Sequence, residues 1–163
     1  MRRKIQKYLS GEREGFSLIE LIIVIAIMAI LIGVVALVVL PYLESSREST
    51  DRAALNEVAT AFKSAASVNS KYAKIADSLG TAKSSSDLAG GSTDEQAFVK
   101  KIGDYLEKSL ADTEKGLSSK SCTGKKFYFQ KSDKGFKVFI GESASKAVVD
   151  SDGVEFSTTP ASK

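Results

Sequence analysis

One carboxylate, Glu20, stands at the start of a long apolar segment, and its position suggests chemistry. From Leu21 to Leu43 the sequence contains no charged residue. About 20 apolar residues in one helix span the hydrocarbon core of a bilayer, and an acidic side chain at its centre costs about 2.5–3.5 kcal/mol on insertion scales. An acid at this depth therefore predicts a function and an oppositely charged partner. The alternative is that Glu20 lies at the headgroup level, where water solvates it.

Residues 1–15 carry the positive charge of the chain. Five basic residues accompany two acidic residues there, a balance of +3 that equals the formal net charge of the whole chain. Basic residues beside a membrane span favour the cytoplasmic side, so we expect the N-terminus inside and the C-terminal part outside. The balanced remainder does not favour DNA binding through phosphate contacts, although lysines and aromatic residues mix at 125–137. Alternating strand faces, with aromatics inward and lysines outward, explain that mixture.

The apolar segment differs from an ordinary secretory signal. Such a signal has an apolar core of about 7–15 residues and ends at a small-residue cleavage site. Here the segment is longer and ends in Leu-Pro-Tyr-Leu-Glu at 40–44 without such a site, so we expect it to stay in the mature protein. A plain signal-anchor helix is an alternative, but it gives no reason for Gly15-Phe16 or Glu20.

The run GFSLIEL at 15–21, followed by the apolar segment, resembles the class III signal of type IV pilins and pseudopilins. The resemblance implies that a membrane-embedded prepilin peptidase cuts between Gly15 and Phe16 and then N-methylates Phe16. It also implies that Glu20 neutralises the terminal amine of a neighbouring subunit during assembly. A new α-amine has a pKa of about 8, and pairing lowers the cost of both charges in lipid.

For the whole chain, the resemblance implies a structural subunit and not an enzyme. The favoured hypothesis is a major type IV pilin, a single-pass cytoplasmic membrane protein that polymerises with copies of itself into an extracellular pilus. Its other partners would be the prepilin peptidase/methyltransferase, the membrane assembly platform and, before assembly, membrane lipid. The alternative is a pseudopilin of a type II secretion or DNA-uptake filament. A membrane-anchored sensor or enzyme with a cytoplasmic tail is a third hypothesis.

The rest of the sequence offers few groups for catalysis or metal binding, and we expect no cofactor and no metal. The chain has no histidine, which removes imidazole ligands and histidine-dependent triads. Cys122 is the single cysteine, so it cannot form a disulfide within the chain, and a structural or free thiol is its simplest interpretation. The Asp-Ser-Asp-Gly run at 150–153 lacks the other ligands of a calcium loop and indicates a hairpin turn.

Gly33 and Pro41 are the positions where we expect the first helix to loosen in a filament. Glycine costs a helix about 1 kcal/mol relative to alanine, and an interior proline about 3 kcal/mol. The resemblance implies a helix-breaking proline in this region, although Pro41 lies about one helical turn later than the commonest pattern. The alternative is that Gly33 only permits close packing and that Pro41 only kinks the exit from the membrane.

The helical pattern continues beyond the apolar segment. Opposite charges four residues apart, at 47 and 51 and at 48 and 52, favour a helix. Apolar residues then recur at mostly three- and four-residue steps: Leu55, Val58, Phe62, Ala65, Tyr72, Ile75 and Leu79. We expect one helix from Phe16 to about Ser70, or as far as Leu79, with a membrane-spanning first half and an amphipathic second half.

The residue pattern of the C-terminal part predicts an α+β fold. In this fold, a three- or four-stranded antiparallel sheet packs on the amphipathic half of the long helix. Residues 80–91 form a Gly/Ser-rich loop, and Ser92–Glu95 resembles a capping box. This box starts a second helix with Phe98, Ile102, Leu106 and Leu110 on its apolar face and Gly116 beyond its end. Strands are expected at 127–129, 136–140, 147–149 and 154–156, joined by turns at 132–135 and 150–153.

The predicted organisation has five segments. They are a leader at 1–15, an apolar helix at 16–43, an amphipathic helix at 44–79, a loop region with the second helix at 80–124, and a sheet region at 125–163.

Overall fold

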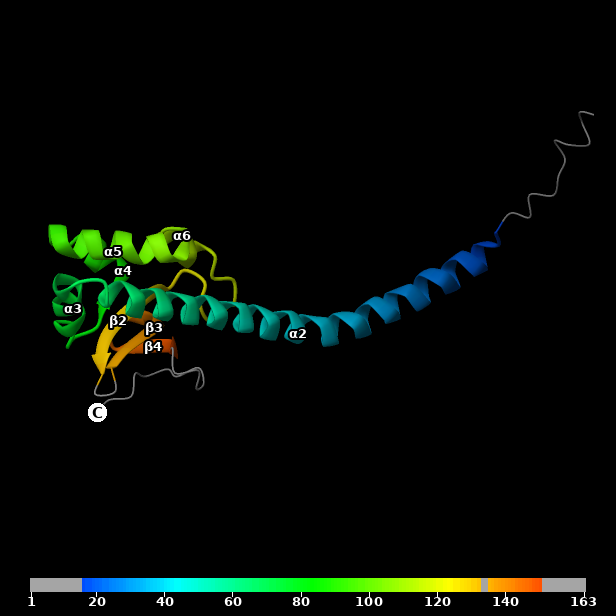
Figure 1. Cartoon of the computed structure of the whole chain (residues 1–163). Helices are drawn as coiled ribbons and strands as arrows, with labels where there is room; N and C mark the ends of the chain where they lie inside the picture. The colour runs from blue at the N-terminus through cyan, green and yellow to red at the C-terminus, as the bar shows by residue number, and fades with distance from the viewer. Residues whose placement is uncertain (1–15, 133–134, 151–163) are drawn as a thin grey trace, which may run out of the picture. The chain divides into compact units, whose positions relative to one another are not determined.

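The computed structural model describes residues 16–132 and 135–150. Its first element is a long helix, α2 (Leu18–Ala66), which continues through Pro41 without a break (Figure 1). The chain divides into two compact units, Met1–Tyr42 and Leu43–Lys163. In the first unit the apolar side chains of α2 are exposed, and the helix is long and apolar enough to cross a membrane.

The long helix ends earlier than its apolar periodicity predicts. α2 stops at Ala66, and a separate helix, α3 (Ser70–Asp77), follows after three residues. Asn69 causes the restart, because its extended backbone and its side-chain oxygen, which accepts from the Tyr72 N–H at 2.9 Å, form an N-cap. The expected continuation of one helix to Leu79 was therefore wrong. Tyr72 and Ile75 still pack against the core, but they do so from α3.

Three more helices follow α3, and two of them, α4 and α5, begin with a capping box. α5 (Thr93–Leu106) has the predicted capping box of Ser92 and Glu95, and Phe98, Ile102 and Leu106 are buried. Leu110 is also buried, but it begins a new helix, α6 (Leu110–Lys115). The segment interpreted as a loop contains a two-residue strand, β1 (Lys83–Ser84), and the helix α4 (Ser85–Ala89), which a second capping box starts.

The sheet has the order β1-β2-β3-β4 with antiparallel neighbours throughout. β2 (Lys126–Ser132), β3 (Gly135–Ser143) and β4 (Lys146–Asp150) contain the three strands expected from the sequence. The fourth strand is β1, while the one expected at 154–156 lies outside the described residues. So do most of the turn expected at 150–153 and part of the turn at 132–135. The α+β fold of a long helix and a small antiparallel sheet is confirmed.

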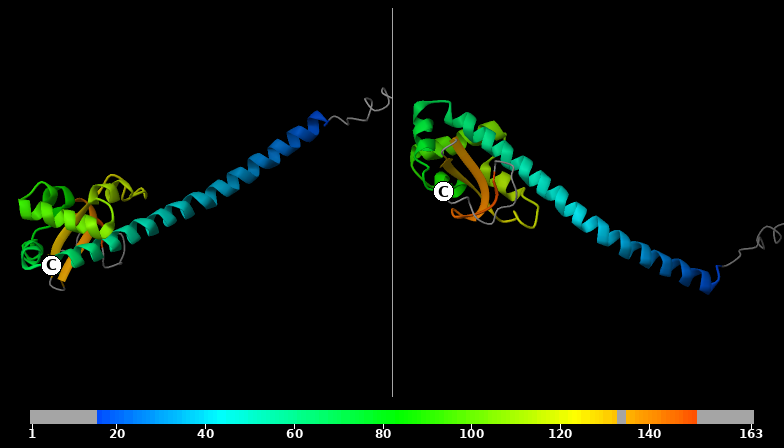
Figure 2. Two further views of the ribbon diagram at one scale, coloured as in Figure 1. Left: turned by 45° about the horizontal axis from the view of Figure 1, so that its top comes forward. Right: turned by 90° about the horizontal axis from the view of Figure 1, so that it is seen from below.

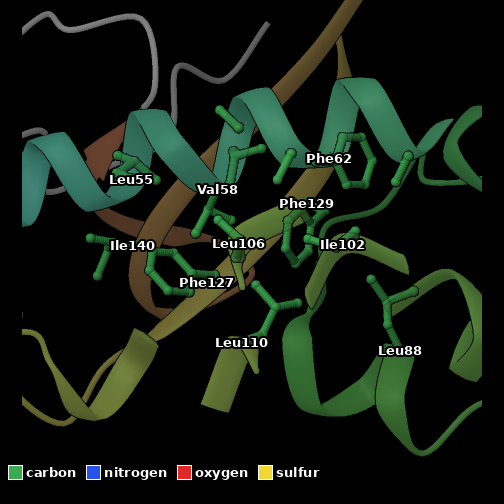
Figure 3. Close-up of a cluster of buried hydrophobic side chains, with 14 of the residues drawn as sticks. Leu55, Val58, Phe62, Leu88, Ile102, Leu106, Leu110, Phe127, Phe129 and Ile140 are labelled. Carbon is green, nitrogen blue, oxygen red and sulfur yellow. The ribbon is translucent and has the colours of Figure 1, made fainter. Parts of the chain in front are cut away.

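The main core lies between the second half of α2 and one face of the sheet. Leu55, Val58 and Phe62 of α2 are buried against Phe127, Phe129 and Ile140 of β2 and β3 (Figure 3). The rings of Phe62 and Phe129 stack with centroids 4.9 Å apart. Figure 2 shows the orange strands beside the green, C-terminal part of α2 in both views. The predicted packing of the sheet on the amphipathic half of the helix is thus observed.

A second, smaller buried cluster lies on the opposite face of the sheet. It consists of Ala82, Tyr128, Phe139 and Ala147 and is named here the outer cluster. Successive side chains of a strand point to opposite faces, so Tyr128 cannot share a face with Phe127 and Phe129. The expectation that the aromatic residues at 125–137 all point inward was therefore wrong for Tyr128.

Candidate functional site

The carboxylate of Glu20 closes the first turn of α2. The Ser17 N–H donates to Glu20 Oε2 at 2.8 Å, and the Ile19 N–H lies 3.4 Å from Ser17 Oγ. The Leu21 N–H donates to the Ser17 carbonyl oxygen at 3.2 Å, the first i to i−4 bond of the helix. Glu20 is the third residue of α2, and its carboxylate thus makes one of the two bonds of a capping box, accepting from the amide of Ser17, the residue before the helix.

This geometry gives Glu20 a local electrostatic role. A carboxylate in the first turn interacts favourably with the positive end of the helix dipole, typically by 0.3–1 kcal/mol at exposed positions. Among the described residues, the Ser17 amide is the one hydrogen-bond donor within reach, and no lysine or arginine forms an ion pair with Glu20. Since an ionised carboxylate offers about four acceptor sites, most of its capacity is open to a cation.

The remaining predicted site residues lie on both sides of this turn. Phe16 is 91 % exposed and precedes the helix, while Gly15 and the leader lie outside the described residues. Gly33 lies within α2, and a Cβ added there would meet nothing within 4 Å. Pro41 also lies inside the helix. The structure therefore brings Phe16 and Glu20 to one helix end, whereas loosening at Gly33 and Pro41 in a filament stays a prediction.

Asp51 is an important residue whose role sequence analysis missed. Its side chain is 1 % exposed, although it lies on α2. Its carboxylate accepts from the Ser118 N–H at 3.0 Å, the Ser119 N–H at 2.9 Å and the Ser119 hydroxyl. These bonds satisfy a buried charge and tie the loop that precedes β2 to the long helix. We name this arrangement the Asp51 clasp.

A second carboxylate of α2 supports the Asp51 clasp. Glu44 accepts from the Lys120 N–H and also forms an ion pair with Arg47 at 3.6 Å. The opposite charges of Arg47 and Asp51, four residues apart, favoured a helix in the sequence, and the helix is present. The two side chains do not pair with each other, because Asp51 is buried against the loop and Arg47 contacts Glu44. The 44–51 spacing of seven residues, two helical turns, is the signal that could have placed both acids on one face.

Cys122 lies in the same loop and is a fully buried, free thiol in the main core. Burial raises the pKa of the Cys122 thiol, and the negative charge of the nearby Asp51 carboxylate raises it further. A buried thiol with a raised pKa is a poor nucleophile. Its surroundings therefore agree with a structural role and give no support to catalysis at Cys122.

Comparison with known proteins found a family motif in the N-terminal segment. Residues 12–40 match the family model described as the prokaryotic N-terminal methylation motif. The resemblance of residues 15–21 to the class III signal of type IV pilins and pseudopilins is thereby confirmed. Searches of curated proteins and of solved structures gave no significant match.

Proposed function

We propose that this chain is the precursor of a type IV pilin that is cut between Gly15 and Phe16, N-methylated at Phe16 and polymerised into a surface pilus. The methylation motif at 12–40 supports a precursor of the pilin or pseudopilin kind. The single observation that carries the proposal is the place of Glu20, at the start of an exposed apolar helix with no cationic partner among the described residues.

Cleavage would supply the missing cation. Cutting before Phe16 converts its peptide nitrogen to an α-amine, which is mostly protonated near neutral pH because its ordinary pKa is about 8. In lipid, an ammonium and a carboxylate are each costly alone, and a charge-assisted hydrogen bond between two subunits relieves both. The Ser17–Glu20 bond uses one acceptor site of the carboxylate. A neighbouring subunit's Phe16 amine can therefore bind Glu20 while the cap stays in place.

Two substitutions of Glu20 separate the charge from the cap. Glu20→Gln keeps a good capping-box residue but removes the negative charge, whereas Glu20→Ala removes both. We expect both variants to insert in the membrane and both to yield few or no fibres, because the ion pair is lost in each. Shearing of cells followed by mass spectrometry of the fibre fraction measures the yield, the cut and the methylation together.

Controls make this experiment specific. Glu57→Gln changes an exposed glutamate of α2 outside the apolar segment and should leave the fibre yield unchanged. Gly15→Leu should leave the precursor uncut and therefore provides an assembly-negative reference. A normal fibre yield from Glu20→Gln would show that capping, and not charge pairing, is what assembly requires of Glu20.

A further inference from the structure

The loop between α6 and β2 is held on α2 directly after the uncharged segment ends. We name residues 117–125 the clasped loop. The Asp51 clasp holds its first half, and Glu44 accepts from the Lys120 N–H. Figure 1 shows this loop, in yellow-green, beside α2. The position of Lys120 along the helix is therefore fixed by Glu44, the first charged residue after the apolar segment.

The length of the uncharged helix sets the depth of Glu44 in a bilayer. At about 1.5 Å per residue, the segment from Leu21 to Leu40 covers the roughly 30 Å of a hydrocarbon core. Glu44 follows about 6 Å further along the axis, and each headgroup layer is about 5–8 Å thick. Tyr42, which is 75 % exposed, lies between Leu40 and Glu44, and tyrosine is enriched at membrane interfaces. When α2 spans a bilayer, a residue that contacts Glu44 is thus expected at headgroup level.

The clasped loop carries a free cation and no acidic residue. Its second lysine, Lys125, pairs with Glu142 at 3.0 Å, whereas the described residues give the Lys120 ammonium no partner. Glu44, the acid that accepts from the Lys120 amide, is itself compensated by Arg47 at 3.6 Å. Lysine side chains keep their charged group at the interface while the stem lies along apolar surface. The free ammonium therefore matches the phosphate of a phospholipid headgroup.

We propose that the clasped loop docks on the phospholipid headgroups of the membrane that α2 spans, with the Lys120 ammonium bound to lipid phosphate. The inference rests on the membrane-anchored precursor proposed above. It goes beyond that proposal because it assigns a second contact with the bilayer, made by the second unit and outside the apolar helix.

Docking stabilises the membrane-bound subunit. One lysine close to an anionic leaflet strengthens association with it about fivefold. Glu44 and the Asp51 clasp hold the loop on α2, so the contact forms without ordering a free segment. A subunit that leaves the bilayer for a filament gives up this contact, and docking therefore favours the membrane-bound state until assembly.

Amine acetylation of the full, unaltered chain tests the position of Lys120. A water-soluble acetylating reagent is applied to the chain in neutral maltoside micelles and in nanodiscs that contain phosphatidylglycerol, and mass spectrometry measures each lysine. Lys63 is the matched control, because it is exposed, has no partner among the described residues and lies roughly 28 Å beyond Glu44 along α2. Acetylation of Lys120 should fall severalfold in nanodiscs, while that of Lys63 stays the same.

Three outcomes of this experiment would overturn the proposal. The first is an unchanged Lys120, and the second is equal protection of Lys63. The third is equal protection of Lys120 in micelles by inorganic phosphate, which would assign the site to a free anion. Comigration of the chain with nanodiscs on size-exclusion chromatography shows insertion, so an unprotected Lys120 in that fraction contradicts docking alone. Loss of comigration would instead contradict the membrane anchoring on which both proposals rest.

A phospholipid with a photoreactive diazirine in its headgroup tests the contact directly. In phosphatidylglycerol nanodiscs, this lipid should label peptides that contain residues 117–125. Lys120→Gln keeps the N–H that binds Glu44 but removes the ammonium, so labelling should fall about fivefold. Lys63→Gln should leave it unchanged. Labelling of the unaltered chain should also fall at about 1 M salt, where the Debye length is only about 3 Å. Full labelling of Lys120→Gln would overturn the proposal.

Discussion

At the residue scale, three acidic side chains show how environment gives one functional group different roles. Glu20 caps a helix end in the apolar unit, Asp51 is buried and holds a loop, and Glu142 lies on the surface between two lysines. Each role follows from the donors that surround the carboxylate. Two of these residues give direct predictions on stability.

Removing the Asp51 carboxylate should destabilise the second unit strongly. Asp51→Ala leaves the Ser118 and Ser119 amides without their acceptor, and hydrogen bonds to charged groups contribute about 1.5–3 kcal/mol each. We expect the free energy of unfolding to fall by roughly 3 kcal/mol, measured by urea denaturation of the full chain in detergent. Glu57→Ala, an exposed change on the same helix, should alter it by less than about 0.5 kcal/mol. Equal effects of the two changes would contradict a structural role of the clasp.

Glu142 should remain ionised to unusually low pH. Hydrogen bonds from Lys146 and then from Lys125 lower the pKa of Glu142 from 4.5 to about 2. Because the folded-state pKa is depressed, the stabilising contribution is fully present above pH 4.5 and is lost as the pH falls towards 2. A carboxyl-carbon NMR titration should give this low midpoint, and Lys146→Gln should raise it. A midpoint near 4.5 in the unaltered chain would show that the lysines do not hold the carboxylate in solution.

At the element scale, a helix boundary was predicted well where neighbouring residues form a recognisable capping motif. It was predicted poorly where only the spacing of apolar residues was used. The Ser92–Glu95 box predicted the start of α5, and at the start of α2 the Glu20 carboxylate accepts from the Ser17 amide. Apolar spacing alone continued the long helix to Leu79, because residues on α2 and α3 face the same core. The side-chain cap of Asn69 decided that boundary.

The apolar half of α2 gives a prediction about the assembled fibre. If the helix loosens between Gly33 and Pro41, hydrogen exchange in sheared fibres should be faster there than at 21–32. In Gly33→Ala, the added methyl group meets nothing within 4 Å, so the change acts through helix propensity, about 1 kcal/mol. Exchange at 33–41 should then slow about fivefold, since 1.4 kcal/mol corresponds to tenfold. Uniform protection from 21 to 41 in the unaltered fibre would contradict loosening.

At the scale of the whole molecule, one helix belongs to two compact units with different surfaces. The first unit exposes apolar side chains around α2, while the second buries the other half of α2 under a sheet. This arrangement supports a subunit that moves from a membrane to a filament, whether that filament is a pilus or a pseudopilus.

Filament length separates these two possibilities. A pilin should be recovered as long filaments when cells are sheared, because the assembled fibre extends outside the cell. We therefore expect the mature chain, starting at Phe16, to be the most abundant protein of the sheared fraction. Its recovery only from the cell envelope, with no filaments in the sheared fraction by electron microscopy, would favour a pseudopilin of a secretion or DNA-uptake system.

The sequence alone determined the features that depend on neighbouring residues along the chain. These are the motif around Gly15, Phe16 and Glu20, the uncharged span, the α5 cap and the alternation of the main strands, since each is a short-range pattern of residue types. Tertiary structure alone decided the burial of Asp51, the pairing of β1 with β2 and the two-sided burial of the sheet. Each of these joins residues far apart in the chain, and only packing can determine which donor meets a carboxylate or which side chain covers a ring.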